Sequence, residues 1–488
     1  MGSIEKIHEM LVSKECSCTE LTKSYLDEIE KADGELNAYV NVTGEEALKT
    51  AEAVDRKIAS GEEIGMLEGV PMTLKDNIST KGIETTCCSK ILTGYKPIYN
   101  ATVWETLAGE NAVMLGKTNM DEFAMGSSCE TSYFGGAMNP FDSNYVSGGS
   151  SGGVASAVGA NIAAYGLGSD TGGSIRQPAS FCGIVGLKPT YGAVSRYGLI
   201  AYASSLDQIG PITKSVEDAA IVFDAISKRD EKDSTSKGFV GDTYSKLNND
   251  IKGMKIGIAK EYLEGVRDDV KEAGFKAFLK AADIYKSMGA EIVYFDLPEL
   301  KFALPVYYII ACAEASSNLG RYDGIRFGYK TEHYNGTHDM VCRTRSEGFG
   351  EEVKRRILLG TYVLSAGYYD AYYKKAQNLR GTIVKAFNNA FEKCDVILAP
   401  TVPMTAFEKG HAVSDPIETY LTDICTVPVN IAGLPGVSVP CGFNAKGMPI
   451  GMQLIGKSFG EAEILNAAYK YQQAAAENFK DTKWGVKL

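Results

Sequence analysis

Residues 148–153 read Gly-Gly-Ser-Ser-Gly-Gly, and residues 168–174 form a second run, Gly-Ser-Asp-Thr-Gly-Gly-Ser. The first run resembles a flexible linker in composition, but it leads directly into small residues (154–162) that are typical of a helix packed closely on a sheet. A Walker phosphate loop needs a Gly-Lys-Ser or Gly-Lys-Thr ending, and the dinucleotide-binding pattern needs a downstream acid, so neither fits. Glycines let backbone N–H groups point inward without obstruction. The two runs therefore indicate loops that hold a nucleophilic serine, Ser174, beside fixed amide donors.

A nucleophilic serine needs a base. The chain has four histidines: His8, His333, His338 and His411. None is near a glycine-rich run, so the sequence gives little support to a Ser–His–Asp triad, although triads assemble across a fold. Lys75, at the end of the alternating strand pattern of residues 70–74, is the other candidate. A lysine acts as a base only when burial or a nearby cation lowers its pKa from about 10.4 toward neutrality. A strand-end lysine is more often a solvated charge, so this assignment depends on burial.

The composition is that of an ordinary globular enzyme, with 44% hydrophobic and 23% charged residues. A net charge of −11 argues against this chain carrying the main nucleic-acid-binding surface, because such surfaces are basic. The 11 cysteines include no Cys-x-x-Cys pair, so we expect reduced thiols and no metal site. The first residues lack a secretion-signal pattern, and no apolar run is long enough to span a membrane. These features predict a cytoplasmic protein without a membrane segment.

The order of the sequence patterns predicts an α/β fold. Residues 1–65 are interpreted as an N-terminal helical segment, with capping boxes beginning at Ser17 and Thr43. Residues 66–488 are assigned to one catalytic domain, in which strand patterns alternate with helices. Residues 227–251 are polar and mixed in charge, and we interpret them as a surface connection within that domain. Alternating strands and helices predict a sheet covered by helices on both faces.

Three motifs resemble those of the amidase signature family, in order and in spacing. They are the two glycine-rich runs, the second continuing to Arg176, and the segment 186–190 (Gly-Leu-Lys-Pro-Thr). The upstream segment 70–76 (Val-Pro-Met-Thr-Leu-Lys-Asp) also resembles the lysine segment of that family. The resemblance implies the family fold, which is a large mixed β-sheet with helices on both faces.

The same resemblance implies a Ser–Ser–Lys relay. Ser174 attacks an amide carbonyl, and Ser150 passes its proton to Lys75 and later returns it to the leaving amine. The peptide bond before Ser150 is expected to be cis. The oxyanion hole is expected to be formed by the amides of Thr171, Gly172, Gly173 and Ser174.

The match to one branch of this family covers nearly the whole chain. Residues 119–128 (Asn-Met-Asp-Glu-Phe-Ala-Met-Gly-Ser-Ser), 186–211, 348–356 and 423–430 resemble the glutaminase subunits of tRNA-dependent amidotransferases. In that branch a Tyr, an Arg and an Asp select free glutamine. The matching residues are Tyr307, Arg356 and Asp423, with Ser128 as a further substrate-binding residue. Arg356 is expected to pair with the α-carboxylate and Asp423 with the α-ammonium group. The adjacent Tyr308 and Arg355 remain open as alternatives.

The resemblance also implies a multi-subunit assembly. A kinase and tRNA-binding partner, the B subunit of such enzymes, is expected to bind most of the tRNA and to activate Glu-tRNA(Gln) with ATP and Mg²⁺. A small C subunit is expected to hold that partner and this chain together. This chain itself is expected to need no cofactor. Two other functions stay open: a stand-alone amidase, with an apolar acyl channel in place of Arg356 and Asp423, and a scaffold subunit without catalytic activity.

Overall fold

The computed structural model describes residues 3–239, 241–264, 268–411 and 416–476, and gives only the backbone of 268–275 and 416–418. Its centre is a mixed sheet in the order β1-β3-β2-β4-β6-β5-β10-β11-β9-β7-β8. Parallel pairing joins β2 to β3 and β4, and β7 to β8 and β9, whereas the other neighbours are antiparallel. The strands are β1 (Tyr39–Val42), β2 (Pro71–Lys75), β3 (Val113–Thr118), β4 (Tyr165–Asp170), β5 (Val185–Lys188), β6 (Gln208–Thr213), β7 (Lys255–Ala259), β8 (Glu291–Phe295), β9 (Val396–Pro400), β10 (Gly436–Phe443) and β11 (Pro449–Ile455).

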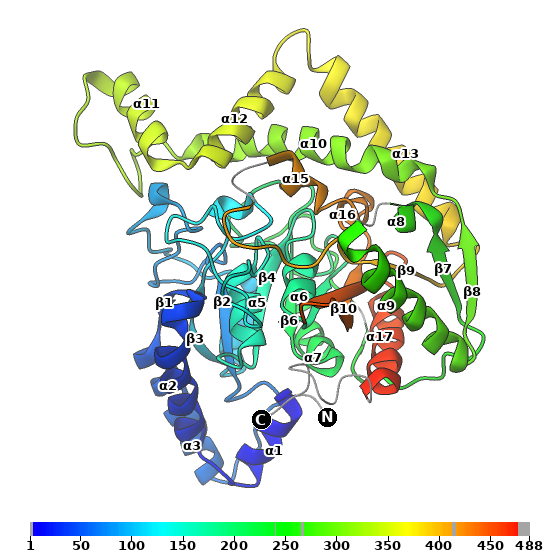
Figure 1. Cartoon of the computed structure of the whole chain (residues 1–488). Helices are drawn as coiled ribbons and strands as arrows, with labels where there is room; N and C mark the ends of the chain where they lie inside the picture. The colour runs from blue at the N-terminus through cyan, green and yellow to red at the C-terminus, as the bar shows by residue number, and fades with distance from the viewer. Residues whose placement is uncertain (1–2, 240, 265–267, 412–415, 477–488) are drawn as a thin grey trace.

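Helices surround this sheet, and none within the described ranges is long and apolar enough to cross a membrane. The α-helices are α1 (Ser3–Val12), α2 (Cys18–Leu36), α3 (Gly44–Ala59), α4 (Thr102–Gly109), α5 (Gly152–Gly159), α6 (Arg176–Phe181), α7 (Val216–Ile226), α8 (Lys260–Glu264), α9 (Asp268–Ser287), α10 (Ala303–Asn318), α11 (Gly336–Gly348), α12 (Glu351–Leu364), α13 (Lys375–Ala390), α15 (Pro416–Leu421), α16 (Val427–Ala432) and α17 (Glu461–Ala475). The shorter helical turns are η1 (Lys90–Leu92), η2 (Glu122–Ala124), η3 (Pro298–Phe302), η4 (Leu319–Arg321) and η5 (Asp370–Lys374). Figure 1 shows α10, α12 and α13 together above the sheet, and α2 and α3 on the side of β1 and β3.

The side chains of β9, which alternate between two hydrophobic clusters, show that both faces of the sheet are covered. Val396 and Leu398 belong to a hydrophobic cluster that includes side chains of α7, α9 and α17. Ile397 and Ala399 belong to a second cluster, with side chains of α10, α13 and α16. Because successive strand residues point to opposite faces, the two clusters lie on opposite sides of the sheet. The expected mixed sheet with helices on both faces is therefore confirmed.

The N-terminal segment is not wholly helical, which corrects the expectation for residues 1–65. The helices α1, α2 and α3 form, and Ser17 begins the predicted capping box of α2. Thr43 does not cap α3, because its hydroxyl donates to the Met114 carbonyl at 3.0 Å. Between α2 and α3, β1 pairs with β3 and becomes the edge strand of the main sheet. The segment thus contributes to the same sheet, and the boundary after residue 65 stays a prediction.

The strands β2 and β4 bring the predicted catalytic residues to one edge of the sheet. They are parallel neighbours, so their carboxyl ends lie side by side, at Lys75 and Asp170. The first glycine-rich run leads into α5, which packs against both strands, and the second run leads from β4 into α6. The described part of 227–251, which lacks residue 240, contains no helix or strand, as expected for a connection.

Candidate active site

Lys75 is completely buried, as its predicted role requires. Its Nζ atom lies 2.7 Å from Ser150 Oγ, 3.0 Å from Ser169 Oγ and 3.2 Å from the Ser169 carbonyl oxygen. Burial lowers the pKa of Lys75 to about 8, although the carboxylates of Asp121 and Asp170 oppose this change. The lowered pKa increases the neutral fraction of the amine near physiological pH, and the amine contacts the serine that was predicted to bridge the relay.

Ser150 lies in a loop that glycines make possible. The Gly149–Ser150 peptide bond is cis, as the resemblance implied. A Cβ atom at Gly149 would come within 1.9 Å of Asp121 Oδ2, so only glycine fits there. The Gly149 amide donates to Gln177 Oε1 at 2.9 Å, and the Ser150 carbonyl accepts from the Asp121 amide at 3.3 Å. These contacts fix the backbone on both sides of the Ser150 side chain.

Ser174 lies between β4 and α6 and is 7% exposed, whereas Lys75 and Ser150 are fully buried. Its carbonyl accepts from the Ser151 amide at 3.1 Å, which joins the two glycine-rich runs. Of the three predicted catalytic side chains, Ser174 is thus the one nearest to solvent and substrate. Between these described residues no hydrogen bond links the Ser150 and Ser174 hydroxyls, so the outer step of the relay stays a prediction.

Asp170 and Arg176 form a buried ion pair that holds the nucleophile loop. Arg176 Nε lies 3.1 Å from Asp170 Oδ2, and the arginine also donates to the side chains of Gln453 and Asn430. Burial alone raises the pKa of Asp170, but Arg176, together with Lys188 and Asn430, outweighs that effect and lowers the pKa to about 2. Asp170 therefore stays ionised, and Arg176 connects the loop to α16 and β11 in the C-terminal part of the chain.

The predicted oxyanion hole needs one correction. The Gly173 amide donates to Asp170 Oδ1 at 2.8 Å, so it is not free to stabilise an oxyanion. The amides of Gly172 and Ser174 have no acceptor among the described residues, and with Thr171 they remain the candidates. Thr426, which the sequence did not single out, supports this loop: its hydroxyl donates to the Gly172 carbonyl at 2.7 Å.

The two adjacent tyrosines both lie at the site, but they contact different parts of it. A Cβ atom at Gly172 would come within 2.6 Å of the Tyr307 ring, so Tyr307 packs directly on the candidate oxyanion loop. Tyr308 donates to Asp423 Oδ2 at 3.4 Å and stacks on Tyr420 with 4.3 Å between ring centroids. Both tyrosines are buried or half-buried residues of α10.

The structure favours Arg356 over Arg355 as the ligand of a substrate carboxylate. The Arg356 side chain is 5% exposed, whereas that of Arg355 is 49% exposed. Arg356 donates to Tyr202 at 2.6 Å and to Glu352 at 2.7 Å. Its guanidinium group also lies over the rings of three tyrosines: Tyr202, Tyr308 and Tyr420. The three rings and the Glu352 carboxylate stabilise a positive charge inside the protein, beside Tyr308.

Asp423 is buried and contacts Ser127, whereas the role of Ser128 as a substrate-binding residue stays a prediction. Its carboxylate accepts from Ser127 Oγ at 3.1 and 3.2 Å, whereas Ser128 Oγ accepts from the Glu130 amide at 3.4 Å. Burial raises the pKa of Asp423 to about 7, because hydroxyl partners and the more distant Arg356 only partly compensate. Among the described residues, no cation lies within ion-pair distance of this carboxylate.

Gln177 connects the surroundings of Asp423 to the first glycine-rich run. Its Nε2 donates to the Ser127 carbonyl at 2.8 Å, and its Oε1 accepts from Gly149. Ser127 lies within the segment 119–128 and Gln177 directly follows Arg176, but neither residue was assigned a role of its own from the sequence. Their partners become adjacent only in the fold.

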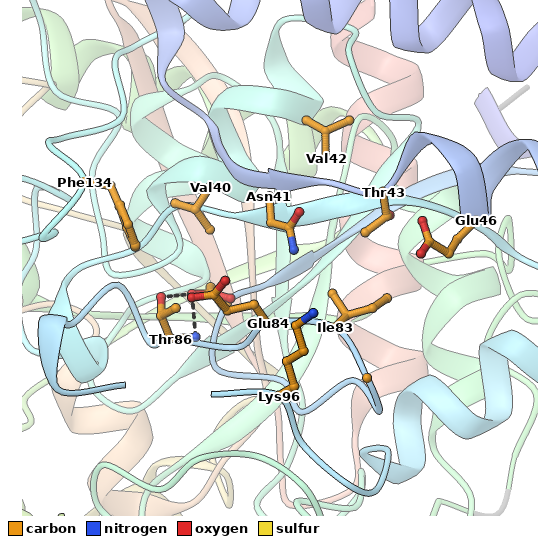
Figure 2. A pocket seen from close by; sticks show the side chains of 12 residues that line it. Val40, Asn41, Val42, Thr43, Glu46, Ile83, Glu84, Thr86, Lys96 and Phe134 are labelled. Carbon is orange, nitrogen blue, oxygen red and sulfur yellow. Dashed lines mark hydrogen bonds between the residues drawn. The ribbon is translucent and has the colours of Figure 1, made fainter. Parts of the chain in front are cut away.

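The described residues contain no group of three or more His, Cys, Asp or Glu side chains arranged to hold a metal ion. A pocket of about 420 Å³ lies beside β1, apart from the predicted catalytic residues (Figure 2). Its lining includes Glu46, Glu84, Lys96 and Asp76, and Figure 2 shows the hydrogen bonds of Thr86 at its inner wall.

Comparison with known proteins agrees with this geometry. The family model described as Amidase matches residues 20–465. The chain is 55% identical over 480 residues to the A subunit of glutamyl-tRNA(Gln) amidotransferase from Thermoanaerobacter pseudethanolicus, covering 98% of this chain and 97% of that protein. It is 56% identical over 464 residues to the same subunit from Lachnospira eligens, covering 94% and 95% of the two chains.

Solved structures show the same likeness. The crystal structure of the A subunit of glutamyl-tRNA(Gln) amidotransferase from Thermotoga maritima is 41% identical, with a TM-score of 0.79 over 96% of this chain and 94% of that one. A bacterial aryl acylamidase of the amidase signature enzymes is 26% identical, with a TM-score of 0.86 over 100% of this chain and 99% of that one. The fold is thus similar to enzymes with different amide substrates, and substrate choice must come from the side chains.

Proposed function

Because the amidase model spans residues 20–465, the chain belongs to the amidase family, and from this premise we propose that it is the glutaminase subunit of a tRNA-dependent amidotransferase. The chain hydrolyses glutamine to glutamate and ammonia, and a partner subunit uses the ammonia to convert Glu-tRNA(Gln) to Gln-tRNA(Gln). The near full-length likeness to proteins named as the A subunit of that enzyme supports this proposal.

The charges of the substrate side chains carry the argument for free glutamine. Asp423 is a buried carboxylate with hydroxyl partners and no cation within ion-pair distance among the described residues. A buried charge without a counterion is costly, and the α-ammonium group of an amino acid supplies one. Arg356 offers the matching positive charge for the α-carboxylate. A fatty or aryl amide has neither group, so it leaves Asp423 without a cation and makes no ionic contact with Arg356, whose charge is otherwise balanced by Glu352.

The catalytic steps follow from the positions of the three side chains. As Ser174 Oγ bonds to the side-chain amide carbon of glutamine, its proton passes to Ser150, and the proton of Ser150 passes to Lys75. The amides of Gly172 and Ser174 stabilise the oxyanion. Lys75 then returns its proton through Ser150 to the leaving nitrogen, which departs as ammonia. Water hydrolyses the remaining ester by the same relay and releases glutamate.

The partner requirements remain part of the proposal. ATP and Mg²⁺ are assigned to a kinase and tRNA-binding B subunit that activates Glu-tRNA(Gln). A small C subunit is assigned to the contact between that partner and this chain. The net charge of −11 supports placing most of the tRNA contact outside this chain.

Ammonia release from glutamine tests the proposed activity, with and without co-expressed partner subunits. We expect release by the assembled complex and its loss in the Ser174→Ala variant. If Ser174→Ala still supports glutamine-dependent amidation of Glu-tRNA(Gln), this chain is a scaffold and the catalytic proposal is wrong. If an aryl amide is hydrolysed and glutamine is not, the chain is a stand-alone amidase.

Arg356→Lys tests substrate selection, with Arg355→Lys as a matched control one residue away. We expect KM for glutamine to rise about 10- to 100-fold in Arg356→Lys, because lysine cannot make a bidentate contact with a carboxylate. Arg355→Lys is expected to change KM less than about twofold, because that side chain is half exposed. Equal effects of the two substitutions contradict the assignment.

A further inference from the structure

The amine of Lys75 has three oxygen partners, and two of them come from one residue, Ser169. Ser169 precedes Asp170 at the end of β4, next to Lys75 at the end of β2. Its hydroxyl and carbonyl oxygens lie 3.0 and 3.2 Å from Lys75 Nζ. The relay as proposed uses only the third partner, Ser150, so the contacts to Ser169 need a reason of their own.

Counting hydrogen atoms suggests that reason. A neutral amine has two N–H groups and one lone pair, whereas the charged form has three N–H groups and no lone pair. A carbonyl oxygen can only accept, so the Ser169 carbonyl always accepts from one N–H group of Lys75. If the Ser169 hydroxyl oxygen accepts from the second N–H group, the lone pair of the neutral amine faces Ser150. After Lys75 has gained the proton from Ser150, each of its three N–H groups has an acceptor.

Asn77 holds the Ser169 hydroxyl in place. Asn77 Nδ2 donates to Ser169 Oγ at 2.9 Å, and both side chains are buried. Lys75 and Asn77 leave the same strand end, two residues apart, so the three side chains form a closed group against β4. Ser169 cannot turn away from the amine without losing the Asn77 contact.

We propose that Ser169, held by Asn77, is a positioning residue that makes Lys75 a stronger base by orienting its lone pair toward Ser150 and by accepting from its charged form. This inference rests on the proposed relay, but the contacts themselves do not depend on which amide is the substrate. It also explains how a lysine without an ion-pair partner can gain a proton inside the protein.

Other groups act on the same amine and must be held constant in any test. The charged and titratable side chains that face Lys75 are those of Asp121, Asp170, Asp207 and Cys129, and none of them is within ion-pair distance. Burial lowers the pKa of Lys75, and the three carboxylates raise it. Substitutions at Ser169 and Asn77 leave all of these groups in place.

The experiment compares pH profiles of kcat/KM for glutamine in the assembled enzyme. In Ser169→Ala we expect the apparent pKa of the acid limb to fall by about one unit, because the charged amine loses an acceptor. We also expect the plateau value of kcat/KM to fall about tenfold. In Asn77→Asp we expect the limb to move up by about one unit, because a negative charge is added near the amine. Shifts in opposite directions are not expected from a general loss of packing.

Ser151→Ala is the matched control. Ser151 Oγ is a buried hydroxyl that bonds to the Ser169 carbonyl at 3.2 Å and to the Ser169 amide at 3.3 Å, but no hydrogen bond joins these two described side chains, Ser151 and Lys75. Its loss is expected to leave the acid limb in place. If Ser151→Ala moves the limb as far as Ser169→Ala does, or if Ser169→Ala leaves it unchanged, the inference is overturned.

A second measurement separates this inference from the glutaminase proposal. Titration of the ¹⁵N resonance of Lys75 Nζ, identified by its absence in Lys75→Met, needs no turnover and can be done in a Ser174→Ala background. The same downward and upward shifts are expected for Ser169→Ala and Asn77→Asp. If the enzyme does not use glutamine but the resonance shifts as stated, only the proposed function fails. If the resonance does not shift, this inference fails.

Discussion

Two neighbouring strands each bury a lysine, and the two lysines have different surroundings. Lys75 ends β2, and Lys117 lies in β3, and both are fully buried. Lys117 pairs in register with Leu74, so its side chain points to the face of the sheet opposite to that of Lys75. Burial lowers the pKa of each to about 8. Burial therefore does not distinguish the proposed base from its neighbour.

The partners of the two amines make the difference. Lys117 Nζ lies 3.9 Å from Asp76 Oδ1 and donates to the Ile78 carbonyl and to the Thr85 hydroxyl. Asp76 in turn accepts from Thr86, at the inner wall of the pocket in Figure 2. Lys75 instead contacts Ser150 and Ser169, and no described carboxylate lies within ion-pair distance of it. Both amines contact hydroxyl groups, but only Lys117 also has a carboxylate within ion-pair distance, which favours its charged form. Lys75 has no such partner among the described residues and can exchange a proton with Ser150.

The strongest way to test this comparison is to remove the proposed base. Lys75→Met is expected to lower ammonia release by about 10⁴-fold, because Ser150 then has no proton acceptor. The unfolding free energy, measured in urea, is not expected to fall much, because methionine fills the space without the cost of a buried amine. A loss of activity below tenfold would show that another group is the base.

The matching substitution on the other strand is expected to change stability instead. Lys117→Met leaves the buried Asp76 carboxylate without its cation and should lower the unfolding free energy by about 3–5 kcal/mol. The double variant with Asp76→Asn should recover part of that loss, because the amide is uncharged. Activity per folded molecule is expected to stay within about tenfold. If Lys117→Met loses activity at full stability, the roles assigned to the two lysines are reversed.

The smallest effect is a pH dependence of stability. The pKa of Lys75 is about 8 in the folded protein, below its ordinary value of 10.5, so between these values the unfolded chain binds more protons. The unfolding free energy should therefore rise with pH, by about 1 kcal/mol between pH 8 and 9 from this residue. The difference between wild type and Lys75→Met measures this contribution. If the unfolding free energy of the wild type, relative to that of Lys75→Met, falls or stays level as pH rises through 8, burial is not the cause of the lowered pKa.

The sequence predicted the parts of the site that depend on local pattern. The alternating strand before Lys75 and the two glycine-rich runs led to the relay residues, and the family resemblance led to the cis bond before Ser150. Strand β1 was missed because Tyr39–Val42 is short and lies between two strongly patterned helices. Its strand conformation depends on pairing with β3, which is distant in the sequence.

The remaining differences depend on contacts that no local pattern contains. Arg355 and Arg356 could not be separated because the apolar run Ile357, Leu358 and Leu359 hides which side of α12 is inward. Gly173 is no longer a candidate donor to an oxyanion because its amide donates to the Asp170 carboxylate. The direction of that carboxylate cannot be read from the local sequence. The contact of Ser127 with Asp423 joins residues that are 296 positions apart along the chain.

The ties between the nucleophile loop and the end of the chain have a consequence for biosynthesis. Arg176 is held by Asn430 and Gln453, and the loop carbonyl of Gly172 is held by Thr426. A polypeptide still on the ribosome, with these residues not yet made, has the catalytic serine but lacks the anchors that shape it. We therefore expect unfinished chains not to hydrolyse glutamine, because the anchors of this loop are made only when translation is nearly over.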